Sequence, residues 1–598
     1  MIPTIRLRVA GAAALAATAV LVPLLAHASP AAAVAPAEVV SPLPQTPDAN
    51  PDTQISFLGA PASELSAVVV HGTLSGLHGG VLRAYSTGTG ASFLPASPFD
   101  SGEQVTVTAT LTPPGAPAQK IGTTFTVSSP YTLPPPGPAQ PVKITATNVR
   151  RFRSRPDLRP SAVTVTTPAA NPALGDILLS PDSGPGQNGA MIVAPSGQLV
   201  WFTALPTGQA AFDLQVQSYR GRPALTWWQG EIIGGHGQGT DVIDNTRYQR
   251  LATVHAGNGL DADLHDFEIT PQGTAWITAY APQHWDLSTD GGLRAGLIDD
   301  GVVQEIDIAT GLVMFEWHAL GHVAIAGSYK HAPREDGDVL DFFHLNSIDP
   351  LSDGDLLISS RNMWAVYLIS ATTGAVEWQL GGRSSTFTLG AGVRFAWQHD
   401  ATLLPNGTIT LFDNEAGPEE ASQSRAVDIS INPTSQTASL VNQITYPGAG
   451  IIAESQGNIQ ELSNGDSFVD WGQAGEISEF SPGDTLTFDM HLSAPANSYR
   501  AFRESWQAQP ATRPALAVRA AGRRTEVWAS WNGATNVTAW RVLAGNSQHR
   551  LHIVGTYPAS GFETAVSAPT AKRLVRVQAL GDGRVLLRNS PLIAARPR

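Results

Sequence analysis

The sequence contains no cysteine, which excludes a disulfide framework, a cysteine-ligated zinc site and a thiol nucleophile. Charged residues make up only 14% of the 598 residues, and the balance is acidic, with 36 Lys+Arg against 50 Asp+Glu. This balance argues against a nucleic-acid partner, which would favour a basic surface. By contrast, 57 glycines and 45 prolines are too many for long helices, and they favour short strands joined by turns.

A single long apolar run occurs, at the start of the chain. Arg6 and Arg8 precede an apolar stretch over residues 9–26, and Ala-His-Ala at 26–28 has the form of a cleavage site. We therefore expect a signal peptide at 1–28 and a secreted, extracellular protein that has no membrane partner after cleavage. The alternative is an uncleaved membrane anchor, since the stretch is nearly long enough to span a bilayer.

Composition changes along the chain indicate three folded parts. Period-two alternation between Gly, Pro and Ser clusters is typical of small β-sandwiches, and it occurs near both ends. We expect sandwich domains to act in spacing or in contacts with a cell surface, and we assign them no chemistry. The expected layout is an Ala/Pro-rich tether at 29–50, an Ig-like β-sandwich at 51–130, a Pro-rich linker at 131–142, a central domain at 143–505 and a fibronectin-III-like domain at 513–598.

The central segment repeats a pattern of an apolar strand, a Pro/Asn/Asp-x-Gly turn and a second apolar strand. Between some of these units lies a further hairpin, as at 306–313 and 369–376. Two hairpins make a four-stranded blade, and units of roughly 40–60 residues with this content indicate a β-propeller. Counting one weaker unit at about 211–255, we predict an all-β protein with a six-bladed β-propeller. The repeated turns are centred on Gly197, Gly273, Gly354, Gly407 and Gly465.

Three histidines occupy nearly the same place in three of these units. His265 and His399 lie eight residues before their turn glycines, and His344 lies ten before its own. Each is therefore expected at the start of a first strand, the strand that lines a propeller's channel. Arg361 should return close to His344 across an antiparallel hairpin, as Asp413 and Asn414 should return to His399.

This cluster favours a tetrahedral oxyanion over a metal. Three imidazoles suggest zinc, but Arg361 cannot lose its charge and would repel a cation. A guanidinium suits sulfate or phosphate, and a neutral imidazole can attack such a centre and hold it covalently. The alternative is that these histidines cap turns or satisfy buried backbone groups.

Six spaced motifs occur in order along the central segment: Leu264-His265-Asp266-Phe267-Glu268, Phe343-His344-Leu345-Asn346, Ser359-Ser360-Arg361, Trp378-Gln379-Leu380-Gly381-Gly382-Arg383, Trp397-Gln398-His399-Asp400 and Leu411-Phe412-Asp413-Asn414. These motifs resemble those of a known family, the arylsulfate sulfotransferases. The similarity covers most of the predicted propeller and implies a six-bladed fold that moves a sulfuryl group from a phenolic sulfate ester to another phenol, without a nucleotide sulfate donor. Characterised periplasmic members carry a disulfide near the nucleophile, whereas this chain has no cysteine.

The resemblance implies roles for individual residues. His399 would be the nucleophile that becomes sulfated, His344 is favoured as the acid/base, and His265 and Arg361 would hold the sulfuryl oxygens. No cofactor and no metal are expected, and the partners would be a small aryl sulfate donor and a phenolic acceptor. Candidate substrate-binding residues are Asn346, Trp364, Trp397 and Asn414. Tyr367 is a further aromatic that could stack on a phenol ring, although each of these aromatics could instead pack between blades. Asp400 and Asp413 could orient imidazoles.

Two other functions remain open at this stage. A non-catalytic surface propeller would bind glycans or sulfated ligands without turnover, and a sulfatase or phosphatase would use water as the acceptor. Separately, His318, His322 and His331 are expected in a surface loop between blades three and four. A lid or a metal site is the alternative for these three.

Overall fold

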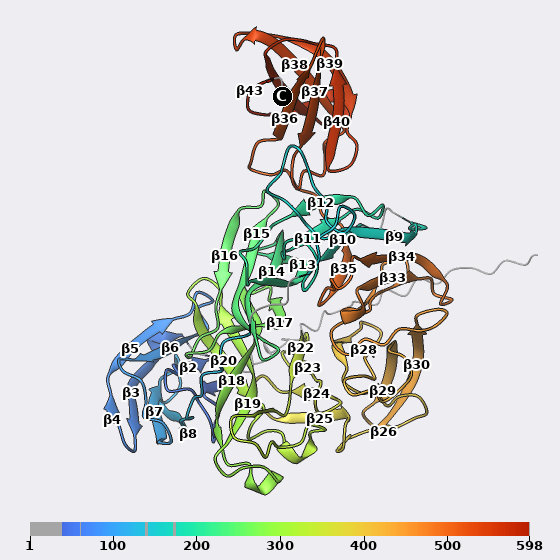
Figure 1. Ribbon diagram of the computed structural model, residues 1–598. Helices are drawn as coiled ribbons and strands as arrows, with labels where there is room; N and C mark the ends of the chain where they lie inside the picture. The colour runs from blue at the N-terminus through green and yellow to red at the C-terminus, as the bar shows by residue number, and fades with distance from the viewer. Residues whose placement is uncertain (1–38, 60, 138–141, 172–174, 597–598) are drawn as a thin grey trace, which may run out of the picture. The chain divides into compact units, whose positions relative to one another are not determined.

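A computed structural model describes residues 39–59, 61–137, 142–171 and 175–596 (Figure 1). The signal peptide predicted at 1–28 and much of the tether lie outside these residues. The described chain is all-β, as predicted, and its helical segments are short 3-10 turns. No helix in the described ranges is long and apolar enough to cross a membrane. The 3-10 turns are Ala62–Glu64, Ser288–Asp290, Ile325–Gly327, Gly472–Ala474 and Asp582–Arg584.

The central part consists of antiparallel units of four strands, two of which join into one larger sheet through a single pairing of β15 with β17. The first unit is β10 (Asp176–Leu179), β11 (Met191–Val193), β12 (Leu199–Phe202) and β35 (Ala501–Glu504). The joined units are β13 (Ala210–Tyr219), β14 (Arg222–Ile233), β15 (His236–Asn245) and β16 (Arg250–Val254), then β17 (Ala262–Ile269), β18 (Thr274–Trp285), β19 (Gly296–Asp307) and β20 (Leu312–His318).

Three further units follow along the chain. They are β22 (Leu345–Pro350), β23 (Leu356–Ser360), β24 (Ala365–Ile369) and β25 (Val376–Gly381); β27 (His399–Leu403), β28 (Thr408–Asp413), β29 (Arg425–Asn432) and β30 (Thr437–Thr445); and β31 (Asn458–Glu461), β32 (Ser467–Asp470), β33 (Glu476–Phe480) and β34 (Leu486–Leu492). Extra strands extend three of the sheets: β9 (Val163–Thr167) pairs with β34, β21 (Val339–Asp341) with β19, and β26 (Thr388–Leu389) with β30.

The five repeated turn glycines explain why the pattern recurs in the sequence. Each has a positive φ, at 75°, 84°, 99°, 87° and 86° for Gly197, Gly273, Gly354, Gly407 and Gly465. Glycine adopts this left-handed region without the steric cost that a Cβ would add. Each turn joins the first two strands of a unit or, at Gly197, β11 to β12, so the repeated Gly marks real hairpins.

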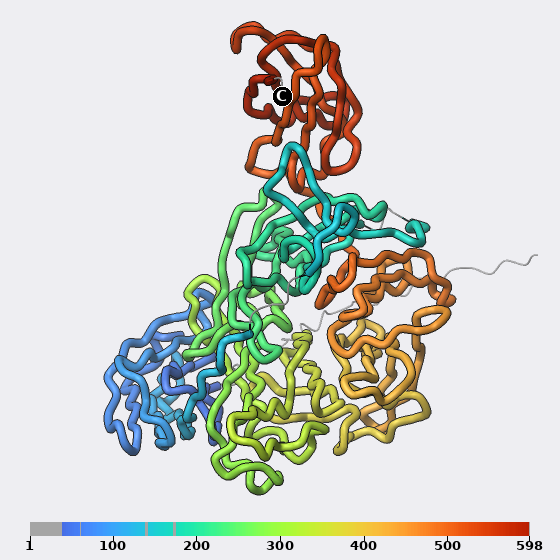
Figure 2. The backbone as a smooth tube through the Cα atoms, viewed as in Figure 1, coloured from blue at the N-terminus to red at the C-terminus, as the bar shows by residue number. Residues whose placement is uncertain are grey.

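Strand β35 joins the two ends of the central part. It comes last in that part of the chain, yet it pairs antiparallel with β10, with Ile177 opposite Arg503 and Leu179 opposite Ala501 (Figure 2). The unit that contains β10 is therefore completed by residues more than 300 positions later. This pairing brings the C-terminal strand beside the N-terminal one and links the first and last units.

The core lies between neighbouring units because alternate residues of one strand face opposite ways. In β23, Leu357 packs with Ile409 and Val427 of the next unit, whereas Ile358 packs with Phe343 and other residues on the opposite side. Both faces of the sheet are thus buried. The neighbouring strand β24, Ala365–Ile369, has no charged or amide side chain, as a strand covered on both faces favours.

Two sheets packed around one core precede the central part. One contains β1 (Val39–Ser41), β2 (Ile55–Leu58), β6 (Gly90–Pro95) and β5 (Gly80–Ala84); the other contains β4 (Gly76–His78), β3 (Leu65–Gly72), β7 (Gln104–Leu111) and β8 (Gln119–Thr126). Strand β1 lies within residues 29–50, where we expected only a tether. The difference arises because Val39–Ser41 pairs with β2 and its side chains complete that sheet's buried face.

Two more sheets share a core at the C-terminal end of the chain. One contains β36 (Ala515–Ala521), β37 (Arg524–Ser530) and β40 (Glu563–Ala568). The other contains β38 (Ala539–Ser547), β39 (Arg550–Pro558), β41 (Leu574–Leu580), β42 (Leu586–Asn589) and β43 (Ile593–Ala594).

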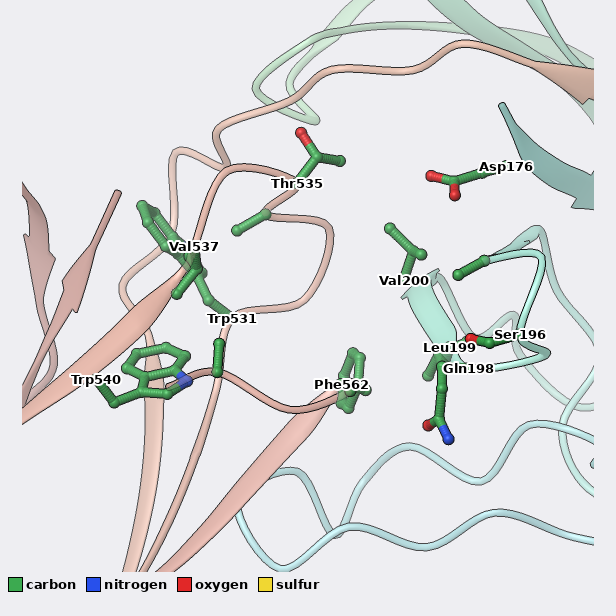
Figure 3. A pocket seen from close by; sticks show the side chains of 14 residues that line it. Asp176, Ser196, Gln198, Leu199, Val200, Trp531, Thr535, Val537, Trp540 and Phe562 are labelled. Atoms are coloured by element: carbon green, nitrogen blue, oxygen red, sulfur yellow. The ribbon is translucent and has the colours of Figure 1, made fainter. Parts of the chain in front are cut away.

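A cavity of about 360 Å³ lies where this part meets β12. The residues Trp531, Trp540, Phe562, Val200 and Asp176 line it (Figure 3). Reciprocal hydrogen bonds between Asn532 and the backbone of Phe202 hold the two parts together beside it.

Candidate active site

Two of the sequence-predicted histidines, His265 and His399, lie on the first strands of their units, and His344 immediately precedes β22. The hairpin geometry brings Arg361 back to His344. The rings of His265 and His344 are 5.1 Å apart. The Arg361 N–H donates to the His344 carbonyl at 2.9 Å, as the antiparallel return requires. His399 lies within electrostatic range of Arg361, His344 and His265, since all three lower its pKa. The structure therefore gathers all four residues into one buried cluster.

His399 is held as a neutral imidazole in a single tautomer. The Asn414 Nδ2 donates to the carbonyls of Ala453 and Gln456, both at 3.0 Å, so its Oδ1 must face His399. The His399 Nδ1–H consequently donates to Asn414 Oδ1 at 2.7 Å, which leaves the lone pair on Nε2. Burial, followed by the charge of Arg361, holds the pKa of His399 well below its usual value. The Gln456 N–H points at Nε2 from 3.2 Å.

His344 is also buried and neutral. Its Nδ1 hydrogen bonds to Asp341, so Nε2 is the free nitrogen. Burial lowers the pKa of His344 to about 4; Asp341 opposes this effect, and His265 and His236 add to it. The residue has a φ of +52°, and Trp364, Trp397 and Asp400 nearby along the chain have φ of +52°, +59° and +57°. Left-handed conformations at non-glycine residues are costly, and they concentrate at functional sites.

His265 is oriented by a carboxylate. Its Nδ1 lies 2.5 Å from Asp263 Oδ2, and Asp263 also accepts hydrogen bonds from the Gly237 N–H and the Thr278 hydroxyl. Burial raises the pKa of Asp263, but the two neighbouring imidazoles and these hydrogen bonds outweigh burial and lower it to about 2. Asp263 is therefore a permanent anion that fixes the ring of His265.

Sequence reasoning missed a fourth histidine, His236. It begins β15, stacks on Tyr280 with ring centroids 3.7 Å apart, and lies 5.3 Å from the His344 ring. Asp299 is 2.9 Å from its Nδ1 and Asp341 is 3.3 Å from its Nε2. Burial opposes the charged form, yet these two carboxylates raise the pKa of His236 well above its usual value. The unit that carries His236 lacks the Pro/Asn/Asp-x-Gly turn, so only the flanking glycines in Gly234-Gly235-His236-Gly237 could have marked it.

Arg361 carries an unneutralised positive charge in this cluster. Its guanidinium donates to the Glu454 carbonyl at 3.0 Å and to Asn362 Oδ1 at 3.1 Å. Among the described residues, no carboxylate forms an ion pair with it. Its Cζ lies 4.9 Å from the Trp397 ring. A guanidinium that is mostly buried and paired only with neutral groups is suited to an anionic ligand.

The other candidate residues divide into two groups. Trp364 and Trp397 meet edge to face at 5.1 Å, and both indole N–H groups are buried without a hydrogen-bond partner, as is Asn346 Oδ1. Tyr367 packs in the core, and its buried hydroxyl likewise has no hydrogen-bond partner. By contrast, Asp413 pairs with Arg425 at 2.9 Å, and Asp400 faces Arg500 at 3.3 Å. The two aspartates therefore do not orient the imidazoles of the cluster, because each has a cationic partner of its own.

Three groups of the cluster are close enough to share a metal ion. Ligand atoms of His236, Asp341 and His344 lie within 4.8 Å of one another. However, Asp341 already bridges the two imidazoles, and Arg361 carries a positive charge in the same cluster. The unpartnered donors therefore fit an oxyanion better than a cation.

The described chain is all-β, and its antiparallel units bring histidines together beside an arginine that has no ion-pair partner among the described residues. Residues 215–493 match the family model of the arylsulfotransferases (ASST). The matched segment contains all four histidines and Arg361. The match supports the family that the sequence resembles.

Other comparisons are more distant. No curated protein matches the chain. A solved protein of unknown function from Bacteroides caccae is 14% identical, with a TM-score of 0.35, and the match covers 55% of this chain and all of that one. A catalytically inactive virginiamycin B lyase from Staphylococcus aureus is 11% identical, with a TM-score of 0.30, over 62% of this chain and 96% of that one.

Proposed function

We propose that the protein is a secreted arylsulfotransferase that moves a sulfuryl group from a phenolic sulfate ester to a phenolic acceptor through a sulfohistidine at His399. The catalytic domain in this proposal is a six-bladed propeller closed by β35, with an Ig-like and a fibronectin-III-like sandwich on either side. No nucleotide sulfate donor and no cofactor take part. The observation that carries the proposal is the tautomer of His399, whose Nδ1–H donates to Asn414 and whose Nε2 keeps a lone pair that accepts the Gln456 N–H.

In the first step, His399 Nε2 attacks the sulfur of the donor, an N–S bond forms, and the bond from sulfur to the phenolic oxygen breaks. Asn414 stabilises the positive charge that develops on the ring by accepting its Nδ1–H. The Gln456 N–H shifts from Nε2 to a sulfuryl oxygen as the lone pair is used. Arg361 stabilises the sulfuryl oxygens in a loose transition state, where alignment and charge stabilisation are the protein's main contributions.

The pKa values divide the proton transfers between two histidines. His344 is neutral at pH 7, so it serves as the base that takes the proton of the acceptor phenol while the phenolic oxygen attacks the sulfohistidine. His236, held cationic by Asp299 and Asp341, is the proton source for the departing donor phenolate. The proton that His344 gains from the acceptor returns to His236 across the 3.5 Å contact between His344 Nδ1 and His236 Nε2, so both residues regain their starting states. His265 holds the sulfuryl group from the other side. This division refines the sequence-based proposal, in which His344 alone carried both transfers.

The covalent intermediate can be detected directly. Protein mixed with 4-nitrophenyl sulfate in the absence of an acceptor should gain the mass of one SO₃ group, and peptide mapping should place it on His399. Added phenol should remove the increment and yield phenyl sulfate. A sulfated-ligand-binding protein would show no covalent increment, and a hydrolase would release 4-nitrophenol continuously without phenol; either result would contradict transfer through His399.

We expect kcat/KM to fall on the acid side with a midpoint below pH 5, and not near 6.5, the usual pKa of histidine. The base form of His344 is the active one, its pKa is about 4, and activity should therefore fall only as the pH drops through that value. Because the unfolded histidine binds protons more readily, acid also favours unfolding between about pH 6.5 and 4. Tryptophan fluorescence at each pH separates the two effects. An acid limb centred at 6.5 with folded protein would contradict the assignment of His344.

A further inference from the structure

A second group of metal-ligating side chains lies outside the catalytic cluster. Asp48 comes from the loop between β1 and β2, Asp300 from β19, and Glu316 and His318 from β20. We expected His318 in a surface loop, but it ends β20 and only 2% of its surface is exposed. That expectation was wrong because its cover is supplied by Asp48, 270 residues earlier in the chain.

The spacing of these atoms suits direct coordination. His318 Nδ1 lies 3.2 Å from Asp48 Oδ2 and 3.0 Å from Asp300 Oδ2, and these three ligand atoms lie within 4.8 Å of one another. Tetrahedral ligands about 2.0–2.1 Å from a zinc ion are separated from each other by roughly 3.3 Å. The three atoms therefore need little movement to become neighbours in one coordination sphere.

The histidine also has a second partner of the kind that metal-bound histidines use. Its Nε2 lies 3.2 Å from Glu316 Oε1, and Glu316 Oε2 accepts hydrogen bonds from Gln304 at 2.5 Å and Asn258 at 2.8 Å. With the proton on Nε2 and donated to Glu316, the lone pair of Nδ1 points between the two aspartates. Such carboxylate–histidine pairs orient the ring and raise its affinity for a metal.

Carboxylates outnumber the groups that can carry a positive charge in this cluster. Three carboxylates surround one imidazole, all four are at most 2% exposed, and no Lys or Arg of the described residues forms an ion pair with them. Asp48 Oδ1 is buried and accepts no hydrogen bond. Buried carboxylates without a counter-charge are costly unless a cation accompanies them.

We propose that Asp48, Asp300 and His318 bind a divalent metal ion that links the N-terminal sheets to the ASST domain. On binding, Nδ1 of His318 donates its lone pair to the ion and any proton there is released to solvent. The Gln283 amide, whose Nε2 is 2.7 Å from Asp48 Oδ2, supplies the fourth ligand when it is rotated to present its oxygen. The ion is structural and takes no part in sulfuryl transfer, so this proposal does not depend on the proposed function.

The experiment loads chelator-treated, full-length protein separately with ZnCl₂, MnCl₂ and CaCl₂, then measures bound metal per chain and the unfolding temperature. We expect about one tightly bound ion, with zinc favoured by the imidazole ligand, and a higher unfolding temperature for the loaded protein. Asp48→Asn and His318→Gln should lose both effects. The exposed Asp286→Asn serves as the matched control and should keep both.

Two further variants keep the test decisive. Glu316→Gln, which leaves every ligand in place, should weaken metal binding about 10- to 100-fold, and this measurement decides the case if the ligand variants do not fold. Asp341→Asn tests the catalytic cluster, and it should leave the bound ion in place. The proposal would be overturned if none of the three ions bound stoichiometrically. It would also be overturned if Asp341→Asn lost the bound ion while Asp48→Asn kept it.

Discussion

His399→Ala should reduce release of 4-nitrophenol from 4-nitrophenyl sulfate by at least roughly 10⁴-fold in kcat, because loss of a covalent nucleophile removes the whole two-step route. The residual rate would come from Arg361 and the remaining histidines, which still bind the donor. The KM for the donor should change much less than kcat. Initial rates over a range of donor concentrations, at saturating phenol, measure both constants.

A matched control is His491→Ala, which removes a histidine from β34, the fourth strand of its unit in the central part. It should retain normal rates. Asn414→Leu should have an effect between these two variants, because the imidazole of His399 remains while its tautomer is no longer held. We expect kcat to fall about 10- to 100-fold. If His399→Ala keeps its activity, the nucleophile lies elsewhere, and the sulfohistidine mechanism is wrong.

Arg500→Met should be the most destabilising single substitution in the central part, by about 3–5 kcal/mol. The buried guanidinium donates to Asp213 Oδ1 at 3.2 Å and to Asp266 at 3.2 and 3.1 Å, and its Nε faces Asp400. Without it, three buried carboxylates would share one region with no cation. Burial already raises the pKa of Asp213 to about 7 and that of Asp400 to about 6.

The unfolding temperature, followed by calorimetry, measures this effect. Arg250→Met is the control, since Arg250 pairs with Asp244 but is 42% exposed, and such a pair contributes no more than about 1 kcal/mol. Arg500→Met should also lower activity in the folded fraction, because Arg500 donates to the carbonyl of Asn346 beneath the site at 3.1 Å. Equal unfolding temperatures for the two variants would show that the buried network does not stabilise the fold.

Local signals accounted for the hairpins and for much of the site. A turn that needs a positive φ requires glycine, so the repeat was visible as Gly273, Gly354 and Gly407. Once the hairpins were set, the antiparallel register brought Arg361 to His344 and Asn414 to His399. These relations span fewer than 20 residues, which is why counting along the sequence found them.

Relations between distant segments left no such signal. His236 belongs to a unit without the repeated turn, and only the fold brings it to Tyr280 and His344. Asp413 lies on β28, beside the strand of His399, but its ion pair with Arg425 keeps it from orienting that imidazole. Pairing of β1 with β2 likewise changed residues 39–41 from an expected tether to part of a sheet.

The amino-acid sequence by itself determined the all-β class, the hairpin repeat, the family and four of the clustered residues, because each depends on local turn geometry or on short motifs. Tertiary structure alone decided the protonation states. Burial makes His344 and His399 neutral, while Asp299 and Asp341, brought from other segments, make His236 a cation. It also decided that His318 lies buried against Asp48. Desolvation and charge proximity act through space, so they depend on how the chain folds.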